Sequence, residues 1–354
     1  MAGQFEIGSK HLEYKKLANA AIEEVKSKNY NEVVKSLYKK SYGMIPSKEA
    51  AYDDYLGAVI AIEEVAKVAP QAASIMVDQM IAQEIINRFG TDEGKKEFSL
   101  NSIYAVLCAE PGLSDIEAMT TRAAKTTSGW NLKGKKSISS EQVNSDKFFV
   151  FARDEEDVVR VFSISKSNLS LNQITKSVAG SDVVLNQLNI ELDVPTNNCI
   201  AVLNSKYEEV QSIARTYIAA VSLGITHSAI VNSITSSKEV KDSSNSAISN
   251  TQSIQFALAD MYAEHDAARM LTYYSANLID NNKANIKYAT MAKVQSTDSA
   301  AAISVQALQI IGNLGYLANT NFADSIQTAV NAQIKGGTNR VQKNQIYQYM
   351  LAKK

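Results

Sequence analysis

A segment rich in glycine and lysine, residues 129–136, shows the clearest single pattern of chemistry in the sequence. It reads Gly-Trp-Asn-Leu-Lys-Gly-Lys-Lys and nearly matches the phosphate-binding loop, in which backbone amides and a lysine hold phosphate groups. Lys136 stands where that loop needs a Ser or Thr hydroxyl to hold magnesium, and the flanking residues do not predict a strand followed by a helix. We therefore interpret the segment as part of a β-hairpin.

Other reactive residue types are scattered along the chain. The cysteines, Cys108 and Cys199, and the three histidines show no spacing typical of a zinc or iron-sulfur site. The serines lack the Gly-x-Ser-x-Gly pattern of a hydrolase nucleophile. We interpret the cluster Glu264-His265-Asp266 as the solvated face of a helix. Single motifs thus predict neither a metal centre nor a hydrolase.

Composition narrows the class of protein further. The chain has 354 residues, 45% of them hydrophobic and 21% charged, and 36 Lys+Arg against 37 Asp+Glu leave a net charge of -1. These values are ordinary for a globular protein, and a nucleic-acid partner would need a basic excess. The most apolar stretches, residues 104–109 and 218–230, are shorter than the roughly 20 residues of a membrane span. With lone cysteines and no apolar leader, a cytoplasmic location is expected.

The elements that must position any site fall into three zones. Before about residue 103, apolar residues recur at helical steps, as at Tyr55, Leu56, Val59, Ile62, Val65 and Ala66. Residues 104–200 contain short β-rich runs at 103–107, 148–151, 158–164, 183–188 and 188–194. Residues 201–354 return to the helical period at 213–234, 254–279, 284–311 and 324–351. The prediction is an α+β, mostly α chain: an N-terminal helical domain (1–103), a middle β-sheet domain (104–200) and a C-terminal four-helix bundle (201–354).

The order of these zones resembles the acyl-CoA dehydrogenase family, whose fold is a helical domain, a β domain and a four-helix bundle. Several segments carry the resemblance in the family's order: 108–115 (Cys-Ala-Glu-Pro-Gly-Leu-Ser-Asp), 129–136, 252–261, 307–316 and 333–342. The first is similar to the family's loop against the flavin and the thioester. The resemblance implies an oxidoreductase that binds FAD and an acyl-CoA.

The resemblance also implies a catalytic glutamate, which removes a proton next to the thioester. Its usual position corresponds to Gly336, and an alternative position used by some members, just before Arg215, corresponds to Ala214. Neither residue is a base. Glu208 and Glu209 are weak candidates, because they precede Arg215 by about two helical turns.

Residues matched to the family's FAD contacts are partly changed. Ser137 stands at the position of a Trp near the flavin, Ser139 keeps the hydroxyl of a Thr, and Lys241 replaces an Arg that contacts the diphosphate. Arg215 and Ser114 correspond to substrate contacts. The full set of expected cofactor residues is Cys108, Ala109, Ser114, Ser139, Lys241, Ser243, Ile248, Gln309, Asn313, Thr338 and Arg340.

The resemblance leads to one expectation and two alternatives. We expect an FAD-dependent oxidoreductase of acyl-CoA thioesters, as in fatty acid metabolism, assembled as a homodimer or homotetramer with FAD between subunits. One alternative is a flavin-dependent two-component monooxygenase, which does not need the glutamate. The other is a non-catalytic binding subunit, in a hetero-oligomer with a paralogue that supplies the missing base.

Overall fold

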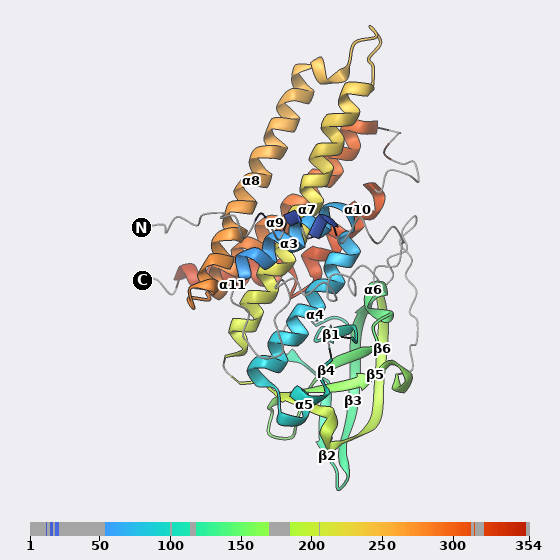
Figure 1. Cartoon of the computed structure of the whole chain (residues 1–354), viewed down its shortest axis with the longest axis vertical. Helices are drawn as coiled ribbons and strands as arrows, with labels where there is room; N and C mark the ends of the chain where they lie inside the picture. The colour runs from blue at the N-terminus through green and yellow to red at the C-terminus, as the bar shows by residue number, and fades with distance from the viewer. Residues whose placement is uncertain are drawn as a thin grey trace.

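The computed structural model has a β-sheet at one end and a long helical bundle at the other (Figure 1). The described residues are 12, 15, 16, 18–20, 54–99, 101–113, 118–169, 185–204, 206–312, 315 and 322–351. Most of the helical region expected before residue 54 therefore lies outside the described residues. Over the described ranges, helices come first, strands follow and helices return, which confirms the expected fold class.

The first described helices are α3 (Tyr55–Val68), α4 (Pro70–Phe89) and α5 (Asp92–Glu97). The Asp54 side chain accepts a hydrogen bond from the Gly57 amide at 2.7 Å and so caps α3, whereas α4 begins with Pro70, whose ring suits a first helical turn. Helix α4 packs against strand β1 (Tyr104–Leu107), and the Gln79 side chain accepts from the Tyr104 amide at 2.9 Å. It also packs against the bundle, so it contacts both parts of the molecule (Figure 1).

Seven strands form one sheet in the order β6-β3-β2-β4-β5-β7, with β1 parallel to β4. The other strands and the short helices between them are β2 (Arg122–Lys125), β3 (Gly129–Ser139), α6 (Ser140–Val143), β4 (Lys147–Arg153), β5 (Val159–Ser165), η2 (Lys166–Asn168), β6 (Leu185–Pro195), η3 (Thr196–Asn198) and β7 (Cys199–Val202). Residues 129–136 lie in β3, which pairs with β2 across a turn closed by a hydrogen bond from the Thr126 amide to the Gly129 carbonyl. The hairpin interpretation is confirmed.

One expectation for the sheet is wrong. Two strands were expected to meet at Leu188, but β6 runs unbroken from Leu185 to Pro195 beside β3. Leu188 and Ile190 are buried while Asn189 and Glu191 are exposed. The alternation of a half-buried antiparallel strand therefore continues through Leu188, and no turn interrupts it.

The C-terminal helices are α7 (Tyr207–Glu239), η4 (Ile248–Asn250), α8 (Gln252–Asp280), α9 (Ile286–Ile311), α10 (Phe322–Ile334) and α11 (Asn339–Leu351). Helix α7 packs against α3, α4, α8, α9 and α10. The single helix expected over 324–351 is wrong, because the chain turns at Gly336 and Gly337, whose φ angles are +68° and +95°. Glycine adopts this backbone region without the steric penalty of a Cβ, so the pair ends α10 and lets α11 start in a new direction.

Helix α7 is, over the described ranges, the one helix long and apolar enough to cross a membrane by length and composition. In the folded chain, 67% of its most apolar window is buried inside the protein. The core helix of a bundle has the same composition, and α7 occupies that place here.

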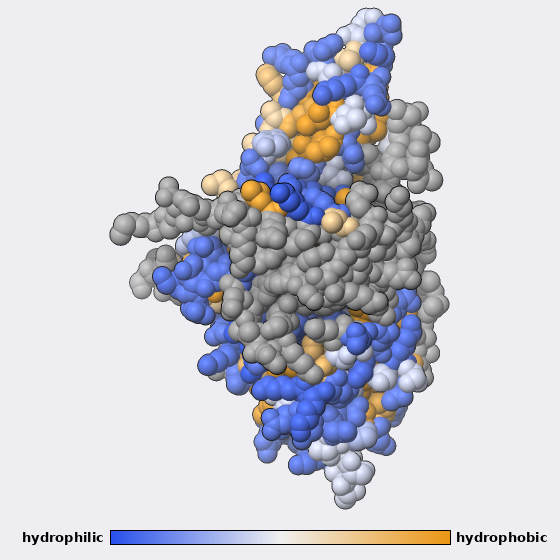
Figure 2. Space-filling model, viewed as in Figure 1, coloured by the Kyte–Doolittle hydropathy of each residue, from blue (hydrophilic) through white to orange (hydrophobic). Residues whose placement is uncertain are grey.

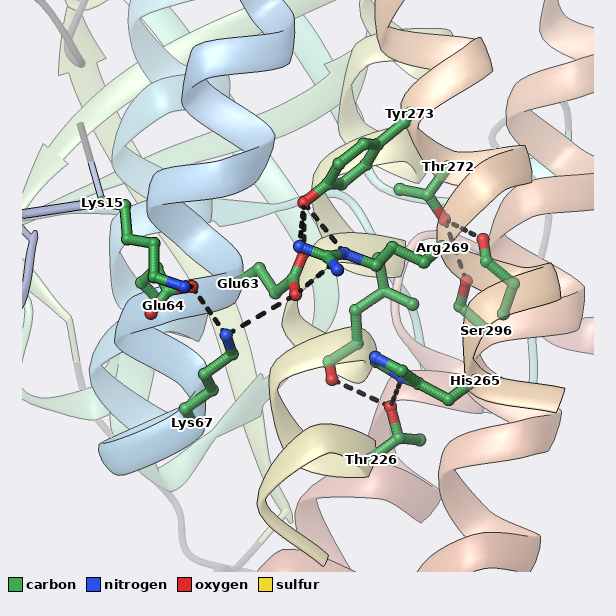
Figure 3. A network of polar contacts seen from close by, with 12 residues as sticks. Lys15, Glu63, Glu64, Lys67, Thr226, His265, Arg269, Thr272, Tyr273 and Ser296 are labelled. Atoms are coloured by element: carbon green, nitrogen blue, oxygen red, sulfur yellow. Dashed lines mark hydrogen bonds and ion pairs between the residues drawn. The ribbon is translucent and has the colours of Figure 1, made fainter. Parts of the chain in front are cut away.

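A buried polar network joins α3 to the bundle (Figure 3). Glu63 on α3 accepts a hydrogen bond from the Tyr273 hydroxyl at 2.7 Å, and Arg269 lies 3.2 Å from its other carboxylate oxygen. His265, expected on a solvated face, is buried, and its Nδ1 lies 2.6 Å from the Thr226 hydroxyl. That expectation is wrong because α8 packs this face against α7.

The far end of the bundle exposes apolar side chains. Figure 2 shows a gathering of apolar residues near the projecting ends of α7 and α8. Large exposed apolar residues on this half of the bundle include Val231, Phe256 and Val305, which are 45%, 61% and 45% exposed. A smaller core cluster, built around Ile230, Met261 and Ile303, lies beneath them.

Candidate active site

The turn between α10 and α11 contains the position where the family resemblance places a catalytic glutamate. Gly336 occupies that position with a φ of +68°, and a Cβ built on it would lie 2.6 Å from Cδ1 of Ile218 on α7. Both observations oppose a side chain here: the backbone is in the left-handed region, and α7 already fills the space. The turn therefore brings its main chain close to α7 but supplies no carboxylate.

Buried side chains hold the carbonyls of this turn from the bundle side. Lys293 on α9 donates to the carbonyls of Gln333 and Gly337 at 3.0 and 2.9 Å, and to Oδ1 of Asn339 at 2.7 Å. Gln342 on α11 donates to the carbonyls of Gly336 and Gly337 at 2.8 and 2.9 Å. Burial, with a further contribution from Arg215, lowers the pKa of Lys293 to about 7. The carbonyls of the turn are thus held from the bundle, while Gly336 itself is exposed.

On the opposite side, the turn meets α4 and the sheet through four polar residues, which we call the junction cluster: Ser74, Asp78, Gln142 and Lys335. Lys335, the residue before Gly336, lies 2.7 Å from Oδ1 of Asp78 and donates to the Ser74 hydroxyl at 2.9 Å. Gln142 on α6 donates to Oδ2 of Asp78 at 2.5 Å. Asp78 is 2% exposed. A buried carboxylate thus lies one lysine side chain away from the turn.

The junction cluster continues to Ser139, the residue matched to the family's flavin-binding hydroxyl. Ser139 ends β3 and precedes α6, and its amide donates to Oε1 of Gln142 at 3.0 Å. The same Gln142 side chain donates to Asp78, so one amide group links the end of β3 to α4. Ser139, Asp78 and Gly336, distant in sequence, therefore converge at one place.

The loop after β1 carries Cys108, Ala109 and Glu110, and is held from behind by a buried ion pair. The Glu110 carboxylate lies 2.9 Å from Nζ of Lys136 and accepts hydrogen bonds from the amides and hydroxyls of Thr120 and Thr121. Burial by itself raises the pKa of Glu110, but these hydrogen bonds outweigh it and lower the pKa to about 2. Lys136 also donates to the Cys108 carbonyl at 3.2 Å, which fixes the loop to β3.

The remaining expected catalytic and substrate residues lie on α7. Arg215 is buried and donates to the Thr290 hydroxyl on α9 at 2.5 Å, so it faces the helix that carries Lys293. Ala214 is half-buried against the core. Glu209 pairs with Arg88 at 2.6 Å, and Glu208 is exposed. Along α7 these two acids lie about 15 Å from Ile218, the residue that touches the turn.

A second group of expected cofactor residues lies at the other end of the bundle. Lys241 and Ser243 are exposed in the loop between α7 and α8, and Ile248 begins η4. Gln309 is exposed in the last turn of α9. From Ile218 to the end of α7 is about 30 Å, so this group is well separated from the turn in one chain.

The other expected contacts are placed as follows. Thr338 lies directly after the glycine pair, and Arg340 is exposed in the first turn of α11. Ser114 and Asn313 lie outside the described residues. Gly312 ends α9, with a φ of +69°.

Sequence reasoning missed Asp78, Gln142, Lys335 and Lys293. A usable signal was present for Asp78: it is an acid directly after the apolar run Ile75-Met76-Val77 of a buried helix. Acids are almost never fully buried without a partner, so this position predicts a paired carboxylate. Its partner could not be read from the sequence, because Lys335 lies 257 positions away.

The expected cofactor residues form two groups, one around the 108–113 loop and one at the far end of the bundle, and their chemistry fits the two ends of FAD. Glu110 is turned inward, which leaves Ala109, Pro111 and Gly112 exposed on the loop's outer side. Gly112 has a φ of +78°, and no described atom lies within 4 Å of a Cβ built there, so a flat ring can approach the main chain. At the far end, the ammonium of Lys241, the hydroxyl of Ser243 and the amide of Gln309 are exposed donors suited to a diphosphate.

Comparisons with known proteins agree with this arrangement. Residues 15–101 match the family model described as Acyl-CoA dehydrogenase, N-terminal domain, and residues 209–351 match Acyl-CoA dehydrogenase, C-terminal domain. The human mitochondrial short-chain specific acyl-CoA dehydrogenase is 28% identical over 316 residues, which cover 84% of this chain and 76% of that protein. Cyclohex-1-ene-1-carbonyl-CoA dehydrogenase of Geobacter metallireducens is 24% identical, with 92% of each chain covered.

A solved structure extends the likeness to the whole fold. Butyryl-CoA dehydrogenase from Megasphaera elsdenii superposes with a TM-score of 0.85 at 24% sequence identity, covering 98% of this chain and 100% of that chain. The two family models flank the sheet that carries the 108–113 loop and Ser139. The resemblance inferred from the sequence motifs is therefore confirmed, and the chain belongs to the acyl-CoA dehydrogenase family.

Proposed function

We propose that this protein is an FAD-dependent oxidoreductase that acts on an acyl-CoA thioester. One observation carries the proposal: segments matched to the family's flavin and thioester contacts converge at a single junction. Ser139 at the end of β3, the turn at Gly336 and helix α7 with Arg215 all meet there. The sequence separates these segments by more than 70 residues each, so their convergence is a property of the fold.

The cofactor lies between two copies of the chain in this proposal. The loop at 108–113 and Ser139 receive the flavin ring, whereas Lys241, Ser243 and Gln309 of a second copy hold the diphosphate. The separation of about 30 Å along α7 supports this division, since one chain cannot bring both groups to the same end. Exposed apolar residues at the far end, such as Val231 and Phe256, supply surface for a homodimer or a homotetramer.

When bound, FAD supplies the acceptor for a hydride from the acyl chain. The residues of this chain position the reactants around it. The Glu110–Lys136 pair keeps the 108–113 loop rigid, and the hydrogen bonds of Lys293 and Gln342 keep the turn at Gly336 from moving. Arg215, held toward α9, supplies a fixed positive charge near the place of the thioester. Gly336 itself takes no proton, so the proton must go to another group.

The glycine at the base position also favours a second candidate. A two-component monooxygenase needs no base at this turn, and a binding subunit needs none either. A monooxygenase requires FAD to bind and then to react with oxygen after external reduction. A binding subunit requires a paralogue that completes the site, and it forms no product alone.

The test uses the full chain with added FAD. Calorimetry and the visible flavin spectrum measure uptake, and anaerobic addition of butyryl-CoA and longer acyl-CoAs then measures bleaching. We expect uptake, and slow bleaching by at least one acyl-CoA. Uptake without bleaching, but with an oxygen atom inserted into an organic product after chemical reduction, would support the monooxygenase. No uptake at high micromolar FAD would leave the binding subunit.

A further inference from the structure

We propose that Asp78 is the base that removes the proton next to the thioester, in place of the glutamate that Gly336 does not supply. This inference rests on the proposed function, because it needs an acyl thioester at the junction. Asp78 reaches the site from α4, an element on which neither of the two expected base positions lies. The evidence is its position, its remaining capacity to accept a proton and its charge partners.

The position of Asp78 is the first piece of evidence. Asp78 is joined to Lys335, whose next residue is Gly336, and through Gln142 to Ser139. The carboxylate thus lies between the turn where a base is expected and the end of β3 where the flavin is expected. A proton acceptor must lie within hydrogen-bond reach of the carbon that loses the proton, so the proposal places C2 of the thioester beside the Asp78 carboxylate.

Capacity to accept comes second. A carboxylate has about four acceptor sites, and Asp78 receives two donors from the described residues, Lys335 on Oδ1 and Gln142 on Oδ2. Glu110, the other buried carboxylate near the loop, receives five. Asp78 therefore retains lone pairs for a substrate proton, whereas Glu110 has none left.

The charge partner comes third. Lys335 places a positive charge 2.7 Å from Oδ1 of Asp78, and its side chain is 29% exposed. In the proposed step, the bond between C2 and its hydrogen breaks and a bond between an Asp78 carboxylate oxygen and that proton forms. The electron pair stays on C2 and spreads into the thioester carbonyl. As the hydride leaves C3, this electron pair forms the C2–C3 double bond, and FAD, when bound, would accept the hydride as the proposed function requires.

The test separates proton removal from flavin reduction. Methylthioacetyl-CoA has sulfur in place of C3, so it can lose a C2 proton but cannot give up a hydride. Proton NMR in D2O measures the exchange of its C2 hydrogens, with and without FAD, and calorimetry measures its binding. We expect the unmodified protein to catalyse exchange and Asp78→Asn to lose it by about 10² to 10⁴-fold, the usual contribution of a general base.

The matched control is Asp298→Asn. Asp298 lies on the α9 side of the same turn and accepts from Gln333, Asn339 and Lys343, so its loss disturbs the turn without removing a group on the α4 side. We expect this variant to retain exchange within tenfold. Asp78→Asn that exchanges as fast as the control would overturn the proposal. An unmodified protein that binds the thioester but does not exchange its protons would overturn it too.

A second variant protects the test against misfolding of Asp78→Asn. Lys335→Met keeps the carboxylate and removes the cation that faces it, so this variant should still catalyse exchange. A loss of exchange as large as the one in Asp78→Asn contradicts Asp78 as the base. If the unmodified protein binds neither FAD nor the thioester, the proposed function fails first, and that outcome is distinct from the others.

Discussion

Two buried carboxylates, Glu110 and Asp78, each meet a lysine from a distant part of the chain, at 2.9 and 2.7 Å, but their surroundings differ. Lys136 is fully buried beside Glu110, and two threonines supply four further donors. Lys335 is part-exposed, and Asp78 has one further donor among the described residues. The Glu110 carboxylate has all its acceptor sites occupied, and it fixes a loop. The Asp78 carboxylate, where α4, α6 and the glycine turn meet, keeps acceptor sites for the proposed chemistry. Burial alone does not distinguish the two.

Glu63 in Figure 3 is a third buried carboxylate, and it accepts hydrogen bonds from Tyr273 and Arg269 on one of its two oxygens. Glu63 is surrounded by Arg269, Tyr273 and Lys67, all from helices that pack side by side. It joins α3 to α8 and touches no glycine turn or strand end. Because it is a buried charge with charged and hydroxyl partners, Glu63 contributes to stability. None of the described candidate site residues lies next to it.

Breaking the ion pair between Glu110 and Lys136 should have the largest effect on stability. Glu110→Gln or Lys136→Met should each destabilise the protein by about 3–5 kcal/mol, because each leaves one buried polar group or charge without its partner. Asp78→Asn should cost no more than about 1–2 kcal/mol, because Lys335 can turn toward water. Urea unfolding measures the loss of unfolding free energy in each of the three variants, provided that the m-value does not change. Equal losses for Glu110→Gln and Asp78→Asn would remove the distinction between the two carboxylates.

The double variant Glu110→Gln with Lys136→Met provides the control. Removing both partners leaves neither charge in the core, so it should cost less than the sum of the single changes. A double variant as unstable as that sum would mean that the pair is not coupled.

The second prediction concerns acid. The pKa of Glu110 is about 2 in the folded chain and 4.5 in the unfolded chain, so the unfolded state binds the proton first. The carboxylate therefore contributes stability above about pH 4.5, and this contribution, about 3 kcal/mol, is lost as the pH falls toward 2. Unfolding free energies measured over this range should fall less steeply for Glu110→Gln. If the unfolding free energy falls equally steeply with pH in the unmodified protein and in Glu110→Gln, groups other than Glu110 cause the acid sensitivity.

A structural feature of this protein could be predicted from the sequence where residues close together in the chain determine it. The helical and β zones follow from periodicity, and the hairpin at residues 129–136 follows from turn chemistry, so these are confirmed. The glycines at 336 and 337 were visible but were read as part of a helix, because a single sequence does not reveal their positive φ. His265 was placed in solvent for the same kind of reason, since its burial depends on α7.

The candidate site was only half predictable. Ser139, Gly336 and Arg215 could be named from motifs, which are local runs of residues. Asp78 and Lys335 could not be paired, because their contact depends on how α4 packs beside the α10–α11 turn. Pairing across 257 positions is a tertiary property, and no spacing rule in one sequence encodes it.

The third prediction tests how tightly the turn is built. Gly336 has a φ of +68°, and a Cβ built on it would lie 2.6 Å from Cδ1 of Ile218. Gly336→Ala should therefore cost about 1 kcal/mol or more for the backbone and about 1 kcal/mol beyond that for the contact. Thermal or urea unfolding measures the loss. In a protein that already carries Ile218→Val, which removes Cδ1, Gly336→Ala should cost about 1 kcal/mol less, and an unchanged loss would contradict the contact.

The smallest expected effect concerns Lys241 and extends the comparison to the far end of the bundle. The backbone there is fixed: Lys241 pairs with Ala247 in a β-bridge, and Oδ1 of Asp242 accepts from the amides of Ser244 and Ser246 at 2.9 Å. Lys241→Arg therefore changes the head group on an unchanged loop. A guanidinium can bind a diphosphate through two parallel hydrogen bonds where an ammonium acts as a point charge, so FAD should bind tighter by roughly 1 kcal/mol, or about fivefold.

Lys238→Arg, in the last turn of α7, is the matched control, because it makes the same change to an exposed lysine close in sequence but not matched to a cofactor contact. Calorimetric titration with FAD measures both variants beside the unmodified protein. A gain confined to Lys241→Arg places the diphosphate at this loop and, because the loop is about 30 Å from the turn at Gly336, requires a second chain at each flavin. Equal affinities for all three proteins, with FAD bound, would mean that the cofactor is held without this end of the bundle, and the two-copy site would then be wrong.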